Sequence, residues 1–297
     1  MHTKMTRLGL LALAITAAKP RNALAQVSQS ATWDSVAAVL QTSVAQAAGY
    51  YRFNLPRRDV QLRMGDVNIA TSMAAGAWAG FSGDGREATV MGDLVLLASE
   101  LGPALRVLAE RAIDVTAIHN HLVGAEPQLA YVHFHAHGSA VDLARRLAAA
   151  VALTATPLPV ASAAPEPLSI DTARVFQVLG PGRAQGSVAQ VSLTLVPGRV
   201  VIGGETVVPA LGYGTPINVQ AVSPQRVVAT GDFAVIAAQV DPVLDALAAR
   251  GITATAVHSH LIGESPTIYY IHFWADGPLE AVLDGLRSAI QAAREAV

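Results

Sequence analysis

Cysteine is absent from the 297 residues, and this absence excludes disulfide bonds, thiolate nucleophiles and cysteine-ligated zinc. Charged residues are also scarce, at 14% of the chain. Lysine occurs only as Lys4 and Lys19, and no cluster of basic residues follows them, so a nucleic-acid-binding surface is not expected. The hydrophobic fraction of 52%, much of it alanine, indicates folded domains, and the length is sufficient for two of them.

The N-terminus has the three parts of a secretion signal. Lys4 and Arg7 precede an apolar run over residues 8–18 that is too short to span a bilayer, and small residues at 23–25 place the expected cleavage before Gln26. Removing the four basic residues of this segment from the 20 in the chain leaves 16 against 22 acidic residues, a formal charge of −6. We expect a periplasmic or secreted protein with no transmembrane segment after cleavage. The alternative is a cytoplasmic protein with an apolar N-terminal helix.

The chain contains an internal repeat with a constant spacing of 139 residues. The recurring segments are GDLV at Gly92 and GDFA at Gly231, TAIHNHL at Thr116 and TAVHSHL at Thr255, and YVHF at Tyr131 and YIHF at Tyr270. A stretch with four prolines separates the two copies and reads as a linker. The expected organisation is a signal peptide at 1–25, a first repeat at 27–153, a linker at 154–168 and a second repeat at 169–297.

Apolar periodicity predicts the order of elements within each repeat. An opening helix is expected after Asp34 in the first repeat and after Asp171 in the second, with each aspartate as N-cap. After several short strands, one strand is expected to end near Gly92, and a helix to begin at Pro103. Two further strands and a final helix after Ser139 complete the order β-α-β-β-α. The fold class is therefore α+β, in two tandem copies of a mixed or antiparallel sheet with helices packed on it.

Eight of the nine histidines fall in two windows of 20 residues, 119–138 and 258–277. Side chains at positions i and i+2 of a strand point to the same face, so each His-x-His pair projects together. If the two strands of each window form a hairpin, imidazoles from both strands converge. A glutamate lies in the intervening loop of each window. The expected ligands are three histidines and one carboxylate per repeat: His119, His121, His133 and Glu126, and His258, His260, His272 and Glu264.

This donor set suits a divalent transition metal, with zinc favoured and manganese, iron or copper as alternatives. Two other interpretations remain open, a metal-free acid–base site and histidines that only form hydrogen bonds at a sheet surface. Asp93 and Asp232 recur after glycine, where each is placed either to orient a ligand imidazole or to cap a turn. Three further residues are expected around the site rather than in it: His135, His137 and Asp276.

Two family resemblances involve these histidines. His258, His260, Glu264 and His272 are spaced as in the first metal motif of cupins, but the second cupin motif is missing and helices flank the histidine strands. The resemblance to the LppY/LpqO family of exported, duplicated bacterial proteins covers nearly the whole mature chain. The segments that carry it are LPR at Leu55, MGDLVL at Met91, TAIHNHL at Thr116, ATGDF at Ala229 and HFWA at His272.

The LppY/LpqO resemblance implies export but no reaction, since its members are described as probable lipoproteins without an assigned activity. This chain departs from that description because it has no cysteine to carry a lipid. It also has Ser259 where the first repeat has Asn120, which makes a second-repeat site the more doubtful one.

Three functions are therefore expected for the chain. The first is an exported binding protein that holds a divalent metal, and through it a small molecule or an envelope glycan. The second is a metal-dependent hydrolase of envelope or extracellular material, with Glu126 or Glu264 as general base. The third is a structural or interaction module without metal. The sequence leaves open whether the repeats form separate sites or share one, and it does not fix the oligomeric state.

Overall fold

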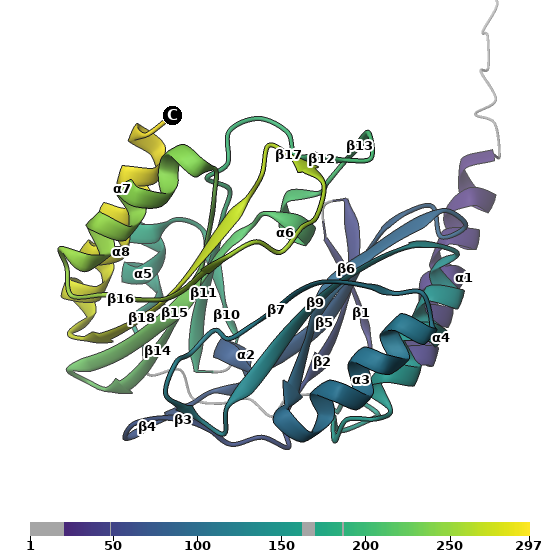
Figure 1. The fold of residues 1–297 in the computed structure, drawn as a ribbon, viewed down its shortest axis with the longest axis horizontal. Helices are drawn as coiled ribbons and strands as arrows, with labels where there is room; N and C mark the ends of the chain where they lie inside the picture. The colour runs from purple at the N-terminus through teal and green to yellow at the C-terminus, as the bar shows by residue number, and fades with distance from the viewer. Residues whose placement is uncertain (1–20, 48, 162–169, 186) are drawn as a thin grey trace, which may run out of the picture.

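The computed structural model describes residues 21–297 apart from 48, 162–169 and 186. It contains two similar units, one from each repeat, and each has a six-stranded antiparallel sheet with helices on its outer face. Figure 1 shows the two sheets in the middle of the molecule and the longer helices of each repeat on the two outer sides, with the short helices α2 and α6 between the sheets. The predicted duplicated α+β fold is confirmed, and every strand pairing in the two main sheets is antiparallel.

The first repeat places its main strands in the order β1-β2-β5-β6-β9-β7, and a small sheet β4-β3-β8 extends from them. Its elements are α1 Arg21–Leu40, β1 Val44–Ala47, β2 Tyr50–Pro56, β3 Leu62–Met64, β4 Val67–Ile69, α2 Thr71–Ala74, β5 Gly76–Gly83, β6 Ala88–Leu97, α3 Ala98–Glu110, β7 Asp114–His119, β8 Ala125–Glu126, β9 Leu129–Gly138 and α4 Ala140–Val151.

The second repeat has the same arrangement, with main strands in the order β10-β11-β14-β15-β18-β16 and a small sheet β13-β12-β17. Its elements are α5 Thr172–Leu179, β10 Gly182–Gln185, β11 Val188–Leu193, β12 Val201–Ile202, β13 Glu205–Thr206, α6 Pro209–Gly212, β14 Thr215–Ser223, β15 Arg226–Val235, α7 Ala237–Ala248, β16 Thr253–His258, β17 Glu264–Ser265, β18 Tyr269–Gly277 and α8 Leu279–Glu295.

Alternation along the strands gives each sheet a helix-facing side and an inner side. On β9, Val132 and Phe134 are fully buried in the core beneath the helices. Tyr131 and His133, one position out of phase, point to the inner side, where the second repeat lies. The central strands are therefore buried on both faces, as their nearly continuous burial shows.

We expected a strand to end near Gly92. Instead, Gly92 lies in the middle of β6, opposite Ala79. A Cβ atom there would be 2.1 Å from the carbonyl oxygen of Trp78 and 2.9 Å from the ring of Phe134. Gly231 has the same constraint, with the Pro216 carbonyl oxygen at 2.0 Å. The recurring Gly-Asp pair is thus a packing requirement followed by an inward-facing acid.

Two predicted helix starts are also corrected. Asp34 is not an N-cap, because α1 begins at Arg21 and continues through it. Likewise, α3 begins at Ala98 rather than at Pro103, and the Glu100 carboxylate accepts the backbone N–H of Leu97 at its start (2.8 Å). Asp171, in contrast, caps α5 as predicted, because its carboxylate accepts the N–H of Arg174 (3.0 Å).

The two repeats are joined by an arm from each that packs on the inner side of the other. The arm of the first repeat contains β3, β4 and α2, and α2 packs against β14 and β15. Side-chain amides of the second sheet bind its backbone: Gln220 contacts Ala70 N and Asn68 O (2.8 Å each), and Gln190 donates to Ser72 O (3.0 Å). The arm of the second repeat, with β12, β13 and α6, packs on β6 and the Met91 side chain.

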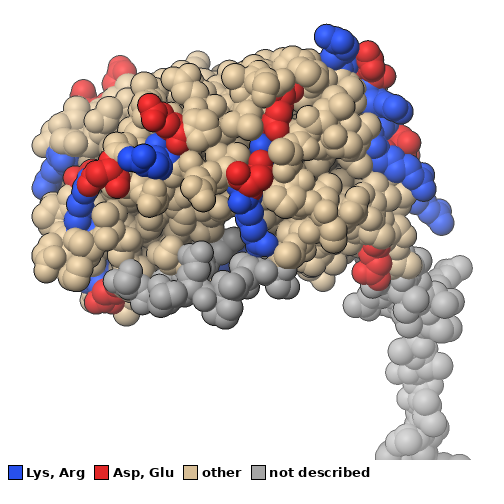
Figure 2. Space-filling model, turned by 90° about the horizontal axis from the view of Figure 1, so that it is seen from below, with Lys and Arg blue, Asp and Glu red and all other residues tan. Residues whose placement is uncertain are grey.

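Charged side chains are sparse on the face of the molecule seen in Figure 2, where basic and acidic residues lie mostly side by side. The described helices include none that is long and apolar enough to cross a membrane. Residues 1–20, the larger part of the predicted signal peptide, lie outside the described residues, as do residues 162–168 of the predicted linker.

Candidate metal centre

Each His-x-His motif lies at the end of the edge strand of its sheet, β7 or β16. In the first repeat, β7 pairs with β9 so that His119 is opposite Tyr131 and Ala117 is opposite His133. In the second repeat, β16 pairs with β18 so that His258 is opposite Tyr270 and Ala256 is opposite His272. The predicted hairpin is thus present in both repeats, and His121 and His260 follow just beyond the strand ends.

The two hairpins meet, and their histidines form one cluster rather than two separate sites. The ring centroids of His119 and His258 are 4.0 Å apart, and those of His121 and His272 are 4.1 Å apart. His133 and His260 are also stacked across the repeats, at 4.7 Å. The histidine cluster, as used below, is His119, His121, His133, His258, His260 and His272.

One nitrogen atom of this cluster has more close contacts than hydrogen bonds alone explain. His119 Nε2 is 3.1 Å from His121 Nε2 and 3.2 Å from His260 Nε2. One imidazole nitrogen carries either one hydrogen or one lone pair, so it forms only one of these two bonds. Two nitrogens bound tetrahedrally to zinc at about 2.05 Å would lie about 3.3 Å apart, close to both distances.

Four of the histidines offer ligand atoms that all lie within 4.8 Å of one another: His119, His258, His260 and His272. A second group within the same limit contains His121, Asp232 and His272. Each repeat contributes residues to both groups. A metal held here would therefore be bound by side chains from both repeats.

Two aspartates orient histidines of the cluster from behind. Asp93 Oδ1 lies 3.2 Å from His133 Nδ1, and Asp232 Oδ1 lies 2.5 Å from His272 Nδ1. A carboxylate accepts a hydrogen bond from the Nδ1–H, which leaves the Nε2 lone pair free for a metal. This is one of the two roles considered for these aspartates; neither of them ends a strand at a turn, because both lie within β6 and β15.

Buried ring nitrogens without a partner complete the argument for a cation. These atoms are Nδ1 of His119 and Nε2 of His133, His258 and His272. Leaving a buried polar atom without a partner is costly, and a metal ion would satisfy several of them at once. The residues present therefore fit a transition metal bound by imidazole nitrogen.

Burial favours the neutral, metal-binding form of His119, His121 and His260. It lowers the pKa of His119 to about 3, with further lowering by the neighbouring histidines, chiefly His258. Burial also lowers the pKa of His121 and His260 well below the usual 6.5. For Asp93, burial alone would raise the pKa, but the charge and hydrogen bond of His133 outweigh it, and the net pKa is lowered.

The cluster borders a cavity of about 1360 Å³ between the two sheets. Three of its histidines, His121, His133 and His260, line this cavity, together with Asp93 and Asp232. The space extends over the arms of both repeats and past the strands β2 and β11. A metal in the cluster would thus be accessible to a molecule in the cavity.

Glu126 and Glu264, expected as ligands or general bases, do not join the cluster. Glu126 is exposed and lies in β8, paired with Arg63 of the arm. Glu264 is buried in β17, and its carboxylate accepts the backbone N–H of Ile268 (3.0 Å). Both residues belong to the small sheets beside the hairpin loop, so neither carboxylate reaches the imidazoles.

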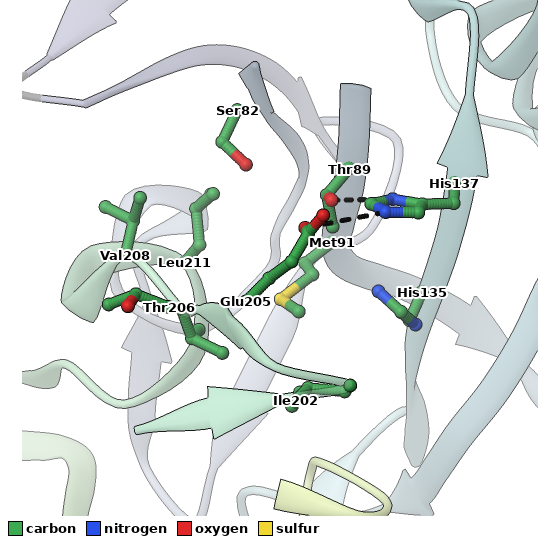
Figure 3. Close-up of a pocket in the computed structure, with 12 residues that line it drawn as sticks. Ser82, Thr89, Met91, His135, His137, Ile202, Glu205, Thr206, Val208 and Leu211 are labelled. Carbon is green, nitrogen blue, oxygen red and sulfur yellow. Dashed lines mark hydrogen bonds and ion pairs between the residues drawn. The ribbon is translucent and has the colours of Figure 1, made fainter. Parts of the chain in front are cut away.

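His135 and His137 continue along β9 on the same face but line a separate cavity of about 240 Å³ (Figure 3). There His137 contacts Thr89 Oγ1 through Nδ1 (2.7 Å) and Glu205 through Nε2 (3.5 Å). In the second repeat the residue equivalent to His137 is Asp276, which forms an ion pair with Arg226 (2.6 Å). We expected these three residues to lie around the cluster. Instead, His135 and His137 line the cavity at the arm of the second repeat, and Asp276 binds Arg226, which also pairs with Asp66 in the arm of the first repeat.

The cavity residues Arg52, Trp78 and Tyr270 were not expected as part of the site. The only sequence signal is the recurrence of tyrosine at positions 131 and 270, at the start of the repeated segments YVHF and YIHF. Both tyrosines stack on a histidine of the cluster, at 3.4 Å for Tyr131 on His121 and 3.9 Å for Tyr270 on His260. Burial raises the pKa of both phenols, so both stay protonated at neutral pH.

The family model described as Domain of Unknown Function (DUF1259) matches the chain twice, at residues 34–153 and 173–292. The chain belongs to this family, and the two matches correspond to the two repeats. No curated protein matches the chain.

Two solved structures show a remote likeness. EtuB from Clostridium kluyveri has 12% identity and a TM-score of 0.22, over 85% of this chain and 90% of that one. The double ringed trimeric shell protein MSM0271 from the RMM microcompartment has 13% identity and a TM-score of 0.21, over 71% of this chain and 84% of that one. Likenesses of this size support no argument about function.

Proposed function

We propose that the protein is an exported metal-binding protein with one divalent transition-metal centre shared by its two repeats. The observation that carries this proposal is the convergence of ligand atoms from four histidines within 4.8 Å, three of which have a buried ring nitrogen without a partner. Zinc is the favoured ion, because four imidazole nitrogens at these spacings suit a tetrahedral centre, and manganese, iron and copper are the alternatives.

Elemental analysis of the purified full-length chain tests this proposal. We expect about one metal ion per wild-type chain and its loss from either single variant, His119→Ala or His258→Ala, because both repeats supply ligands. The double variant His135→Ala/His137→Ala is the matched control, since these histidines lie in the separate cavity, and it should keep its metal. A wild-type chain without metal, or two metals of which each single variant loses one, would contradict a shared centre.

Export is the second part of the proposal. It is supported by the signal-like N-terminus and by the LppY/LpqO resemblance, whose lipid attachment is ruled out by the missing cysteine. Cleavage before Gln26 would cut α1 upstream of Trp33, Val36 and Leu40, the residues of this helix that are buried in the core. N-terminal sequencing of protein from the extracytoplasmic fraction should therefore begin at or near Gln26, and an intact Met1 there would contradict export by cleavage.

A metal-dependent hydrolase is the second candidate, and the adjoining cavity of about 1360 Å³ favours it over simple metal storage. For this role only three of the histidines would bind the metal, so that its fourth position could hold a water of lowered pKa next to that space. The predicted general bases Glu126 and Glu264 are excluded from this role by their positions, and Asp93 and Asp232 are already bonded to imidazoles. Assays of metal-loaded protein on ester, amide and glycan substrates, with His258→Ala as control, would detect such an activity.

A further inference from the structure

Three arginines line the central cavity, and none has a carboxylate partner among the described residues; one of them, Arg58, already donates to the carbonyl oxygen of Ala161. Arg52, on the inner side of β2, is half-buried; its guanidinium lies 4.1 Å above the ring of Trp78, and its Nε donates to Asn54 Oδ1 (2.8 Å). Arg183, exposed at the cavity edge, contacts only the neutral amide of Gln190 (3.3 Å). Neither forms an ion pair among the described residues, whereas the buried Arg57 pairs with two carboxylates.

A buried hydroxyl in the same cavity also has no partner. Tyr270 is 2% exposed, and its Oη makes no hydrogen bond. The equivalent Tyr131 donates its hydroxyl to the carbonyl oxygen of Ala74 (2.5 Å), so the two tyrosines differ although their sequence positions match. Tyr270 is thus an available donor in the cavity wall.

The acids of the cavity do not neutralise these groups. Asp93 is hydrogen-bonded to His133, and the Asp232 carboxylate lies 2.5 Å from His272 Nδ1, so both carboxylates are already next to an imidazole. Among the described residues, the guanidinium groups of Arg52 and Arg183 therefore have no carboxylate partner and the Tyr270 O–H has no acceptor. A ligand that satisfies them must bring hydrogen-bond acceptors and negative charge.

We infer that the cavity binds a small organic anion, whose carboxylate or phosphate group is held by Arg52 and Arg183 and which also accepts a hydrogen bond from Tyr270. The inference rests on the proposed function in one respect: the metal centre would bind the other end of the same molecule. In the order β2-β5-β6-β9, three strand spacings and two residues along the strand separate Arg52 from His133, or about 16 Å between backbones. One molecule that reaches both needs an organic body of several carbon atoms, which Trp78 would contact.

Calorimetric titration of the full-length chain tests this inference, with inorganic phosphate and succinate as separate probes. Each probe is added to metal-free and to zinc-loaded protein, and comparing the probes distinguishes a phosphate from a carboxylate site. We expect at least one probe to bind, and Arg52→Gln to weaken it about tenfold in both forms. Tyr270→Phe should weaken binding about threefold to fivefold, because it removes one neutral donor.

Arg106→Gln is the matched control, since Arg106 is exposed on α3 and does not line the cavity; its affinity should equal the wild type. Arg183→Gln, at an exposed position, provides a second test should Arg52→Gln not fold, and it should weaken binding about threefold. Equal affinity in the wild type, Arg52→Gln and Arg183→Gln would overturn the inference, as would no binding of either probe at millimolar concentration.

Metal content measured on the same samples separates the two proposals. If the chain carries no metal but anion binding depends on Arg52, the metal centre fails and the anion site stands. If metal is bound and neither probe binds, the metal centre stands and the anion site fails.

Discussion

At the residue scale, Asp93 and Asp232 decide which nitrogen of His133 and His272 is available to the cluster. Asp93 is hydrogen-bonded to His133 Nδ1, whereas His272 Nδ1 lies 2.5 Å from Asp232 and is hydrogen-bonded to the Gly231 carbonyl oxygen (3.3 Å); in both histidines Nε2 is left free. Because the two ion pairs are equivalent in the two repeats, the proposed centre is supported from both sides.

Removing one of these carboxylates should weaken metal binding while all four histidine ligands stay in place. We expect Asp232→Ala to lower metal affinity about tenfold to a hundredfold, since the His272 ring loses the partner that fixes its orientation. Competition with a chromogenic chelator measures the change. Asp245→Ala, on the exposed side of α7, is the control, and an equal loss in both variants would argue against the orienting role.

A second residue-scale prediction concerns acid stability. Glu100 bonds Arg57 (2.7 Å) and the backbone N–H groups of Leu97 and Ala155. Burial alone would raise the pKa of Glu100, but these partners outweigh it and the net pKa lies below the usual 4.5. A lowered folded-state pKa means that this carboxylate stabilises the fold fully above its unfolded-state pKa, and that the contribution is lost as the pH falls through the folded-state value.

We therefore expect Glu100→Gln to cost about 2 kcal/mol of unfolding free energy at neutral pH, with Asp59 still pairing Arg57. The difference from the wild type should shrink as the pH falls from about 5 to about 3. Urea unfolding at several pH values measures it. A difference that stays constant with pH would show that the lost interaction is not that of the charged carboxylate.

At the element scale, the central strands leave no room for a side chain at Gly92, where β6 pairs with β5. Gly92→Ala should destabilise the fold by about 3 kcal/mol, because its Cβ would meet the Trp78 carbonyl at 2.1 Å. Gly76→Ala, at the exposed start of β5, is the matched control; the nearest atom outside its chain neighbours would be 4.0 Å from its Cβ, so alanine should change the stability by no more than about 0.5 kcal/mol. Thermal unfolding of both variants measures the two changes in stability. A Gly92→Ala variant as stable as the wild type would contradict the predicted crowding.

Strand alternation also determines how much of the site was predictable. The period of two predicts that His119/His121 and His258/His260 project together, although His121 and His260 lie just beyond the ends of β7 and β16. The same rule says nothing about the loop residues Glu126 and Glu264, and neither belongs to the groups of converging ligand atoms. Histidines further along β9 share the right face but lie too far from the hairpin end, which periodicity alone does not reveal.

At the scale of the whole molecule, the repeat was readable from the sequence and the contact between its copies was not. The docking depends on Gln190, Asn218 and Gln220, whose amides bind the backbone of the opposite arm, and no local pattern distinguishes them from solvated residues. For this reason the sequence could not decide between two sites and one. The structure brings the six histidines of both repeats into one cluster.

A centre shared by both repeats should couple their stabilities. Zinc at a hundredfold excess over its dissociation constant should raise the unfolding free energy by about 2.7 kcal/mol and shift one cooperative transition. His258→Ala should abolish the shift for the whole chain, although it alters only the second repeat. Calorimetry with zinc and with chelator tests this; two transitions, of which only one responds to zinc, would contradict the coupling.

The covalent connection between the repeats has a consequence for how the cavity can specialise. A symmetric pair of identical subunits would present every side chain twice, once on each wall. In this fused chain Arg52 faces the cavity from one wall, while the corresponding position of the other wall carries the neutral Gln190. The two walls can therefore differ in polarity, and an asymmetric molecule can be held in a single orientation.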